Sequence, residues 1–411
     1  MCPVMMGFPL GVLMRRLALL QGLRMMKFSQ VHERYEGGSL SQADAAELLG
    51  VGERTFRRWC VRYSDGGADG LLDRRLGSAA SNRVPAAEAA QVEALYRERY
   101  QGFTAKHFHE HLARTAWFGR SYTWTKLFLQ SRGLLDAAPR RGAHRRKRPR
   151  RPLPGMMPHQ DASRHVWVAG QPACDLVVML DDATSAVLSA ILVPEEGTAS
   201  TFAGLLEVFT AHGLPCSLYT DRGSHYFSAP KAGGAVDRGT LTQVGRALAQ
   251  LGIEHIAAYS PEARGRSERA FRTLQDRLPK ELALAGITTV AAANTWLRES
   301  YVAQHNARFA VAAEQPGSAF VAVPGVNLRE VLCHEETRVV GHDNTVVLHK
   351  TRLQLPPSPL RAHYVRASVK VRRYADGSHA VFHGPRCIGR YDPAGAEMAG
   401  AEMEEQSKQA A

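Results

Sequence analysis

The sequence predicts a multidomain protein in which N-terminal all-α modules precede a central α/β core and a small C-terminal β-barrel. Three observations predict this order. Amphipathic helical patterns occupy the first third of the chain, strand and helix patterns alternate from about residue 156, and short hairpin-like strands follow from about residue 332. The 411 residues suffice for about two to four domains of ordinary size.

The composition indicates the kind of partner. The chain has 52 Lys and Arg residues against 39 Asp and Glu, and its formal net charge of +13 favours a polyanion, nucleic acid first. A hydrophobic content of 45% excludes a wholly disordered chain. The six cysteines show no CxxC spacing, which argues against a disulfide framework or a zinc finger and favours a reducing cytosol.

Residues 1–26 form an apolar, Met-rich extension that Arg15, Arg16 and Arg24 interrupt. No uninterrupted run approaches the roughly 20 apolar residues of a membrane span, so we expect no membrane partner. The charges follow the apolar stretch, whereas those of a signal peptide precede it. Two interpretations stay open: a start codon placed too early, or an extra short helix.

Residues 27–78 are predicted to form a helix-turn-helix DNA-binding domain. Ser41 is a suitable N-cap for a first helix, glycines break that helix at residues 50–52, and a second helix begins near Glu53. Aromatic residues share one face of this second helix, and its other faces carry Arg54, Arg57, Arg58 and Arg62. The pattern is typical of a helix that lies in the DNA major groove. The alternative is a solvated basic helix packed through its aromatic residues.

Residues 79–138 are predicted to form a second helical domain of helix-turn-helix type. There, His107 and His111 would share a helix face, but the nearby sequence offers no third well-placed ligand for a metal ion, so a polar helix face is the favoured interpretation. Residues 139–155 form a proline-punctuated basic linker, which we expect to track DNA phosphates. Its candidate DNA-binding residues are Arg145, Arg146, Lys147 and Arg148.

Residues 156–325 are predicted to form the core. Three strand patterns are followed by helix, strand, helix, strand and helix patterns, which is the order of a ribonuclease-H-like α/β fold. Residues 330–393 contain short strands, with a hairpin signal at Asp376-Gly377 and a second turn at residues 341–344 between strand-like segments. A small β-barrel fits this pattern. Residues 394–411 are expected to be a disordered tail.

Three acidic residues of the core are the candidate catalytic and metal-binding residues: Asp161 in the first strand, Asp221 at the end of the fourth, and Glu268 at the start of a helix. A strand end and a first helical turn can meet at one edge of a sheet. Their carboxylate oxygens suit two Mg²⁺ or Mn²⁺ ions, which can clamp an in-line phosphoryl transfer. Asp181 and Asp182 compete for this role, but their position between two strands favours a turn.

At these residues the sequence resembles the integrase catalytic core of DDE transposases and retroviral integrases. The pattern T-D-x-G-x-x-(F/Y) is met by Thr220, Asp221, Gly223 and Tyr226. The pattern S-P-x-x-x-G-x-x-E is met by Ser260, Pro261, Gly265 and Glu268. Further phrases at residues 55–58, 162–167, 180–185, 273–278 and 305–309 resemble the ISNCY group of bacterial insertion-sequence transposases.

Two departures accompany the resemblance. The separation of Asp221 and Glu268, 268 − 221 = 47 residues, exceeds that of many integrases and fits an insert at residues 228–238. The zinc-binding His/Cys domain that begins retroviral integrases is absent from the sequence, and helix-turn-helix units take its place.

The resemblance implies a transposase that recognises terminal inverted repeats in double-stranded DNA, hydrolyses the transposon 3′ ends and joins them to target DNA. It further implies at least a dimer during synapsis and a cytoplasmic, nucleoid-associated protein. Arg264, Arg266 and Arg272, which flank Glu268, are expected to contact phosphates. His225 fits either a contact to the scissile phosphate or loop ordering. The alternatives are a catalytically inactive DNA-binding repressor and a metal-dependent structure-specific nuclease.

Overall fold

The computed structural model describes residues 10–72, 83–137, 149–228, 236–237, 239–259, 265–357 and 361–398. The chain divides into two compact units, Met1–Arg99 and Tyr100–Ala411. None of the helices within the described ranges is both long enough and apolar enough to cross a membrane.

The first unit is helical. Its elements are α1 (Leu10–Glu36), α2 (Gln42–Leu48), α3 (Glu53–Gly70) and α4 (Ala86–Arg99). Ser41 caps α2 as predicted: its hydroxyl accepts the backbone N–H of Asp44, and the Asp44 carboxylate accepts the backbone N–H of Ser41 in a capping box. Gly50 adopts φ +65° in the turn between α2 and α3, a conformation that glycine adopts without the steric cost of a side chain. Phe28 of α1 and Phe56 of α3 are fully buried together, so the three helices share one core.

α1 begins inside the predicted N-terminal extension and continues past Met26 without a break. It is therefore longer than the short helix considered from the sequence. α3 is interrupted at Gly67, where φ 58° and ψ −148° are not helical. Its arginines all precede this kink and lie in the regular part of the helix.

The second unit begins with two short helices, α5 (Ala105–Ala113) and α6 (Tyr122–Ser131). Their N-caps are Thr104 and Ser121, whose hydroxyl groups accept hydrogen bonds from backbone N–H groups of the first turns. Ser121 is the cap that the sequence predicts. The two helices contact each other, in part through His109 Nδ1 and Thr125 Oγ1, which lie 2.9 Å apart.

The core of the second unit contains a five-stranded sheet in the order β3-β2-β1-β4-β5. Its strands are β1 (Pro158–His165), β2 (Cys174–Asp181), β3 (Val187–Val193), β4 (Ser217–Thr220) and β5 (Glu254–Ala257). β1, β2 and β3 form an antiparallel meander, while β4 lies parallel to both β1 and β5. The predicted α/β order is confirmed.

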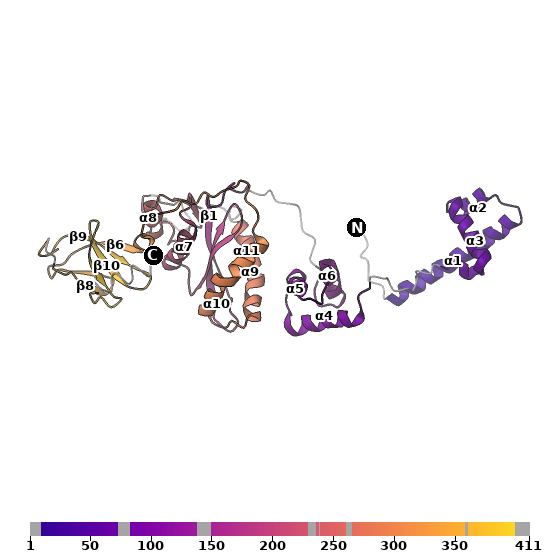
Figure 1. The fold of residues 1–411 in the computed structure, drawn as a ribbon, viewed down its shortest axis with the longest axis horizontal. Coiled ribbons are helices and arrows are strands. Elements are labelled where there is room, and N and C mark those ends of the chain that lie inside the picture. The colour runs from indigo at the N-terminus through magenta and orange to yellow at the C-terminus, as the bar shows by residue number, and fades with distance from the viewer. Residues whose placement is uncertain are drawn as a thin grey trace. The chain divides into compact units, whose positions relative to one another are not determined.

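Helices cover both faces of this sheet (Figure 1). They are α7 (Thr198–His212), α8 (Gln243–Gln250), α9 (Gly265–Leu284), α10 (Val290–Trp296), the π-helix η2 (Leu297–Tyr301) and α11 (Val302–Phe309). Val178 of β2 packs with Phe271 and Leu274 of α9 on one face. The next residue, Met179, points to the other face and packs with α7 and α8.

The C-terminal region contains one short helix and six strands in the described residues. They are α12 (Leu328–Val331), β6 (His334–Val339), β7 (Thr345–Leu348), β8 (Thr351–Gln354), β9 (Ser368–Arg373), β10 (His379–His383) and β11 (Arg386–Tyr391). They form a four-stranded sheet, β11-β10-β9-β6, and a separate two-stranded ribbon, β7-β8.

The predicted small β-barrel is not confirmed, because among the described strands β6 and β11 remain the edges of an open sheet. The expected hairpin at Asp376-Gly377 is present between β9 and β10. The turn at residues 341–344 also forms, but the strands on its two sides do not pair with each other. β6, before the turn, pairs with β9, and β7, after it, pairs with β8. Most of the predicted tail lies outside the described residues.

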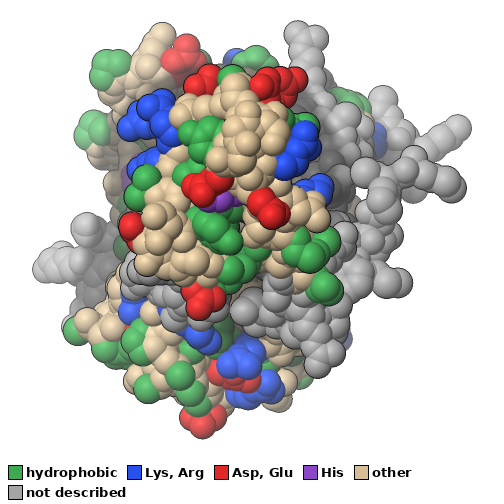
Figure 2. Space-filling view, turned by 90° about the vertical axis from the view of Figure 1, so that its right-hand side faces the viewer, with side chains coloured by type: hydrophobic (Ala, Val, Ile, Leu, Met, Phe, Trp, Pro, Cys, Tyr) green, Lys and Arg blue, Asp and Glu red, His purple; other side chains and the backbone are tan. Residues whose placement is uncertain are grey.

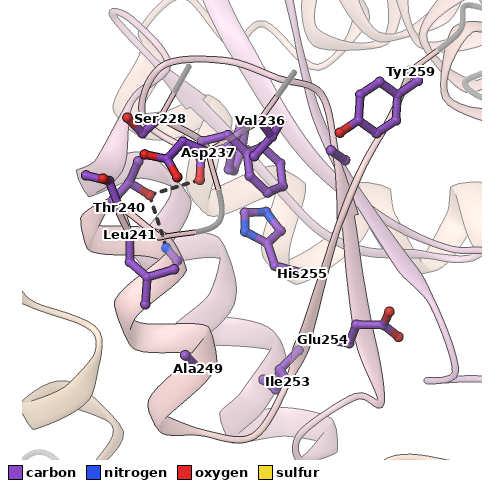
Figure 3. Close-up of a pocket in the computed structure, with 15 residues that line it drawn as sticks. Ser228, Val236, Asp237, Thr240, Leu241, Ala249, Ile253, Glu254, His255 and Tyr259 are labelled. Atoms are coloured by element: carbon purple, nitrogen blue, oxygen red, sulfur yellow. Dashed lines mark hydrogen bonds between the residues drawn. The ribbon is translucent and has the colours of Figure 1, made fainter. Parts of the chain in front are cut away.

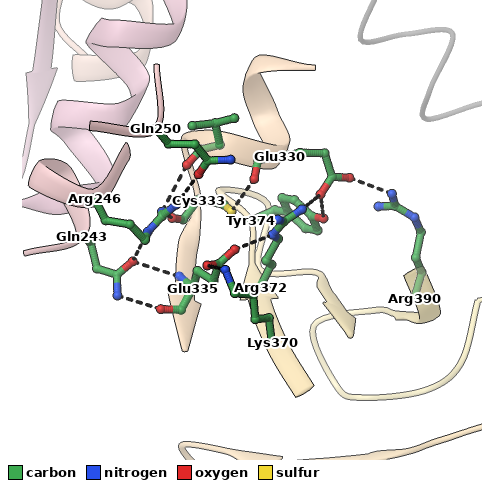
Figure 4. A network of polar contacts seen from close by, with 11 residues as sticks. Gln243, Arg246, Gln250, Glu330, Cys333, Glu335, Lys370, Arg372, Tyr374 and Arg390 are labelled. Carbon is green, nitrogen blue, oxygen red and sulfur yellow. Dashed lines mark hydrogen bonds and ion pairs between the residues drawn. The ribbon is translucent and has the colours of Figure 1, made fainter. Parts of the chain in front are cut away.

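A polar network joins α12 and the sheet that follows it to the core (Figure 4). Arg372 of β9 donates to the carboxylates of Glu330 and Glu335, at 2.9 and 2.8 Å, and Arg390 donates to Glu330 at 2.7 Å. On the core side, Arg246 of α8 donates to the carbonyl oxygens of Val331 and Cys333. Burial opposes ionisation of Glu330, but hydrogen bonds from Tyr374 and the two arginines lower its pKa below the ordinary value.

Candidate active site

Asp161 lies in β1, on the face of the sheet that α9 covers. It pairs in register with Val178 of β2, and Val178 packs against Phe271 and Leu274 of α9. Paired residues of neighbouring strands point to the same face. Asp161 is 9% exposed, and its Oδ1 accepts a hydrogen bond from the backbone N–H of Ala162. The Asp161 side chain is therefore buried between the sheet and the helix that covers it, and is not exposed at the protein surface.

Asp221 directly follows β4, the strand next to β1. His159 of β1 pairs with Tyr219 of β4 in parallel register. Continuing both strands by two residues brings Asp161 opposite Asp221, and adjacent strands lie about 4.8 Å apart. Asp221 Oδ1 accepts the backbone N–H of Gly223 at 2.9 Å, which fixes the start of the following turn.

Other members of the Asp221 motif have structural roles. Tyr226 is 1% exposed, and its hydroxyl donates to Glu196 Oε1 at 3.1 Å. Burial, and next the nearby Glu196 charge, raise the pKa of this hydroxyl well above its ordinary value, so it stays protonated at neutral pH. His225 Nε2 lies 3.6 Å from the same carboxylate. The turn after Asp221 is therefore fastened to Glu196, which supports the loop-ordering interpretation of His225.

Glu268 lies in the first turn of α9 and is exposed. Two contacts fix the position of this helix along β1. Near the start of the helix, Arg266 pairs with Asp182, which follows β2 and lies beside the beginning of β1. Two turns after Glu268, Gln275 Nε2 donates a hydrogen bond to Ser163 Oγ of β1 at 2.8 Å. Along the helix, Glu268 lies between Arg266 and Gln275. Along the sheet, Asp161 lies between the partners of those two residues, Asp182 and Ser163.

Asp161 therefore lies on the face of the sheet that is covered by the helix of Glu268, and Asp221 follows the strand next to that of Asp161. The three carboxylates do not form one of the tight ligand groups found in the described part of the chain, where two sets of three ligand atoms lie within 4.8 Å of one another. Those sets are His107, His111 and Glu281, and His334, Glu336 and His349.

Asp181 and Asp182 form the turn that the sequence favours for them. Asp181 Oδ2 accepts from the backbone N–H and hydroxyl of Thr184, at 2.9 and 2.7 Å. Asp182, with a fully buried side chain, contacts His159 Nε2 at 3.0 Å, accepts the backbone N–H of Arg151 and pairs with Arg266. Sequence reasoning missed this buried ion-pair cluster, because Arg266 lies 84 residues beyond Asp182.

The predicted DNA contacts near Glu268 differ in their surroundings. Arg266 is occupied within the protein, by Asp182 and by the carbonyl oxygen of Pro149 at 3.0 Å. Arg272 is exposed on α9. Arg264, the basic residues 145–148 and most of the insert at residues 228–238 lie outside the described residues.

A cavity of about 260 Å³ lies beside the Asp221 loop, between that loop, α8 and β5 (Figure 3). His255 of β5 points into it, stacks on Phe227 with ring centroids 4.0 Å apart, and contacts Thr220 Oγ1 at 3.0 Å. Burial lowers the pKa of His255 to about 4, so its ring is neutral at pH 7. Because Thr220 precedes Asp221, this histidine helps to fix the end of β4.

The basic residues predicted for DNA recognition are exposed on α3. Phe56 faces the core of the first unit, while Arg54, Arg57, Arg58 and Arg62 are exposed. Seen from the side where α2 and α3 lie in Figure 1, basic side chains alternate with acidic and apolar ones (Figure 2). Arg62 Nη2 donates to the carbonyl oxygen of Leu72 at 3.0 Å.

Comparisons with known proteins found one family model and several distantly similar solved structures. The winged helix-turn-helix family matches residues 31–90. Among solved structures, the magnesium complex of the HTLV-2 integrase catalytic core has 19% sequence identity and a TM-score of 0.28, covering 35% of this chain and 84% of that one. A chain of the simian T-cell lymphotropic virus intasome has 16% identity and a TM-score of 0.32, covering 72% and 95%.

Curated relatives give the family. A protein of Sinorhizobium fredii described as a transposase, y4bF, is 32% identical over 344 residues, which cover 83% of this chain and 74% of the relative. The transposase for insertion sequence IS1202 of Streptococcus pneumoniae is 34% identical over 162 residues, covering 39% of this chain and 34% of the relative. The chain therefore belongs to the transposases of bacterial insertion sequences.

Proposed function

We propose that this transposase binds the terminal inverted repeats of its element in double-stranded DNA and catalyses metal-dependent strand cleavage and strand transfer. The observation that carries the proposal is the parallel register of His159 in β1 with Tyr219 in β4; it supports a position for Asp221 opposite Asp161, on the face covered by the helix of Glu268. Joining two ends requires them to be held together, so the active form is at least a dimer.

The donor set fits divalent metal ions. Asp161, Asp221 and Glu268 offer only carboxylate oxygens, the ligands that Mg²⁺ and Mn²⁺ prefer. They would hold two ions, which when bound stabilise the attacking and leaving oxygens of an in-line displacement. The chain's own contribution is to fix these carboxylates: Gly223 holds the side chain of Asp221, and Gln275 with Arg266 holds the helix of Glu268.

DNA binding is assigned to other parts of the chain. The exposed arginines of α3 suit major-groove recognition, while the basic linker at residues 145–148 and Arg272 suit phosphate contacts, which position DNA without reading its sequence. Recognition and chemistry would then reside in separate regions, so each can be removed without the other.

The function is tested with DNA from the borders of the gene's own element. We expect the full chain to shift a labelled duplex containing the terminal repeat in preference to a scrambled duplex. With Mg²⁺ or Mn²⁺ it should cut at the repeat end, and it should fail with Ca²⁺, whose longer and looser coordination suits in-line transfer poorly. Binding without cutting would indicate a repressor, and cutting governed by DNA structure rather than by the repeat would indicate a nuclease; either result contradicts the proposal.

Recognition gives a second expected result. Arg57→Ala or Arg58→Ala should weaken end binding by about 1–3 kcal/mol if the residue reads a base, and should mainly lower the salt dependence if it contacts a phosphate. Titrations of repeat and scrambled duplexes at several salt concentrations measure both effects. Arg97→Ala is the matched control, since Arg97 lies on α4 and pairs with Glu93. If both variants bound like the control, α3 would not be the recognition helix.

A further inference from the structure

A group of histidine and glutamate side chains in the second unit takes no part in the proposed reaction. His107 and His111 lie one turn apart on α5, and Glu281 lies near the end of α9. Both imidazoles direct Nε2 at the same oxygen, Glu281 Oε1, at 2.6 and 2.9 Å. Their side chains are largely buried, with exposures of 1% for His107, 14% for His111 and 21% for Glu281.

The polar contacts of this group converge on one atom. Two rings share the single oxygen Glu281 Oε1, and the other ring nitrogen of His107, Nδ1, is buried without a hydrogen-bond partner. The structure thus brings three ligand-type atoms together at one largely buried point between α5 and α9.

We propose that His107, His111 and Glu281 bind one divalent transition-metal ion of the zinc class, which fastens α5 to α9. Two histidines four residues apart on a helix plus one carboxylate is a zinc ligand set with a fourth position open to water. The three ligand atoms already lie within 4.8 Å of one another. Bonds of about 2.0–2.1 Å in tetrahedral geometry separate ligand atoms by roughly 3.4 Å, so side-chain shifts of under about 1 Å suffice.

Neighbouring charges are already paired. Arg277 of α9 donates to both oxygens of Glu110 on α5, at 2.7 and 3.1 Å, and Arg308 pairs with the same carboxylate. These contacts hold α5 against α9 and α11, and the one negative charge of Glu110 offsets part of the positive charge of Arg277 and Arg308. Because imidazole nitrogens favour Zn²⁺ over Mg²⁺, this ion would differ chemically from those at the carboxylates of the proposed active site.

The second ligand group, His334, Glu336 and His349, is the natural internal comparison. Glu336 is paired with Arg338, and His349 is 53% exposed. A carboxylate occupied by a guanidinium and a histidine open to water make this the weaker site. It provides control residues of the same chemical types within the same chain.

The test measures metal binding without DNA, so its outcome does not depend on the proposed reaction. The full chain is freed of metal with a chelator and titrated with Co²⁺. We expect one equivalent to bind with the strong visible absorption of a tetrahedral ion, without sulfur charge-transfer bands. Zn²⁺ should remove this absorption in stoichiometric amount, whereas millimolar Mg²⁺ should not.

Variants locate the ion. His111→Gln and Glu281→Gln should each lose the absorption and weaken Zn²⁺ binding at least about tenfold, while Zn²⁺ should no longer raise their melting temperature. His109→Gln, on the same helix, and His349→Gln, in the second group, should bind like the parent. Absence of stoichiometric tetrahedral binding in the parent overturns the proposal without any variant. Loss of binding in His349→Gln, with retention in His111→Gln, overturns it as well.

Discussion

Asp221→Asn is expected to reduce cleavage of repeat DNA to background while end binding is retained. The substitution removes the negative charge on which metal binding at the proposed active site depends, so neither the attacking nor the leaving oxygen is stabilised. The fold should be preserved, because Asn Oδ1 can still accept the backbone N–H of Gly223 that Asp221 Oδ1 accepts at 2.9 Å. End binding should persist, since it is assigned to α3 and the basic linker.

The measurement is cleavage of labelled end DNA with Mg²⁺ and with Mn²⁺, beside a gel-shift titration of the same duplex. Asp376→Asn is the control, because Asp376 lies in the turn between β9 and β10, where its carboxylate accepts hydrogen bonds from the backbone N–H and the hydroxyl of Ser378. Undiminished cutting by Asp221→Asn would show that Asp221 is not a catalytic residue and would contradict the proposed mechanism.

Asp182→Ala is expected to have the largest effect on stability. Its carboxylate is fully buried, forms an ion pair with Arg266, contacts His159 and accepts the backbone N–H of Arg151. Removing one partner of a buried ion pair costs about 3–5 kcal/mol, because the remaining charge stays desolvated without compensation. At roughly 2–4 °C per kcal/mol for a domain of this size, the melting temperature of the core should fall by about 10 °C.

Thermal unfolding followed by calorimetry measures this effect, since the core transition can be separated there from that of the first unit. Asp276→Ala is the control: Asp276 and Lys280 form a partly exposed ion pair four residues apart on α9, which contributes under about 0.5 kcal/mol. A parent-like melting temperature for Asp182→Ala would mean that Arg266 and His159 find other partners.

Features set by neighbouring residues could be predicted from the sequence. The caps at Ser41 and Ser121, the break at Gly50 and the hairpin at Asp376-Gly377 each depend on residues within one turn, and the structure contains all four. The strand and helix order of the core also followed from local periodicity. The register that aligns Asp161 with Asp221 could be anticipated only through the family resemblance.

Features set by distant residues could not be predicted. β6 pairs with β9 across the whole ribbon of β7 and β8, and no local signal distinguishes this pairing from a hairpin with β7. Glu281 lies 170 residues beyond His111, so the spacing of His107 and His111 indicates half a ligand set and nothing about the rest. The pairing of Arg266 with Asp182 likewise arises from tertiary packing.

The contact between Arg246 and the segment before β6 decides where a shortened chain can end. Val331 and Leu332 belong to the apolar cluster of α7 and α8, and the carbonyl oxygens of Val331 and Cys333 receive the partly buried guanidinium of Arg246. A fragment stopping at residue 325 would expose that cluster and leave Nη2 of Arg246 without the two carbonyl acceptors that it has here. An isolated catalytic fragment for crystallisation should therefore include Glu335, whose backbone also contacts Gln243.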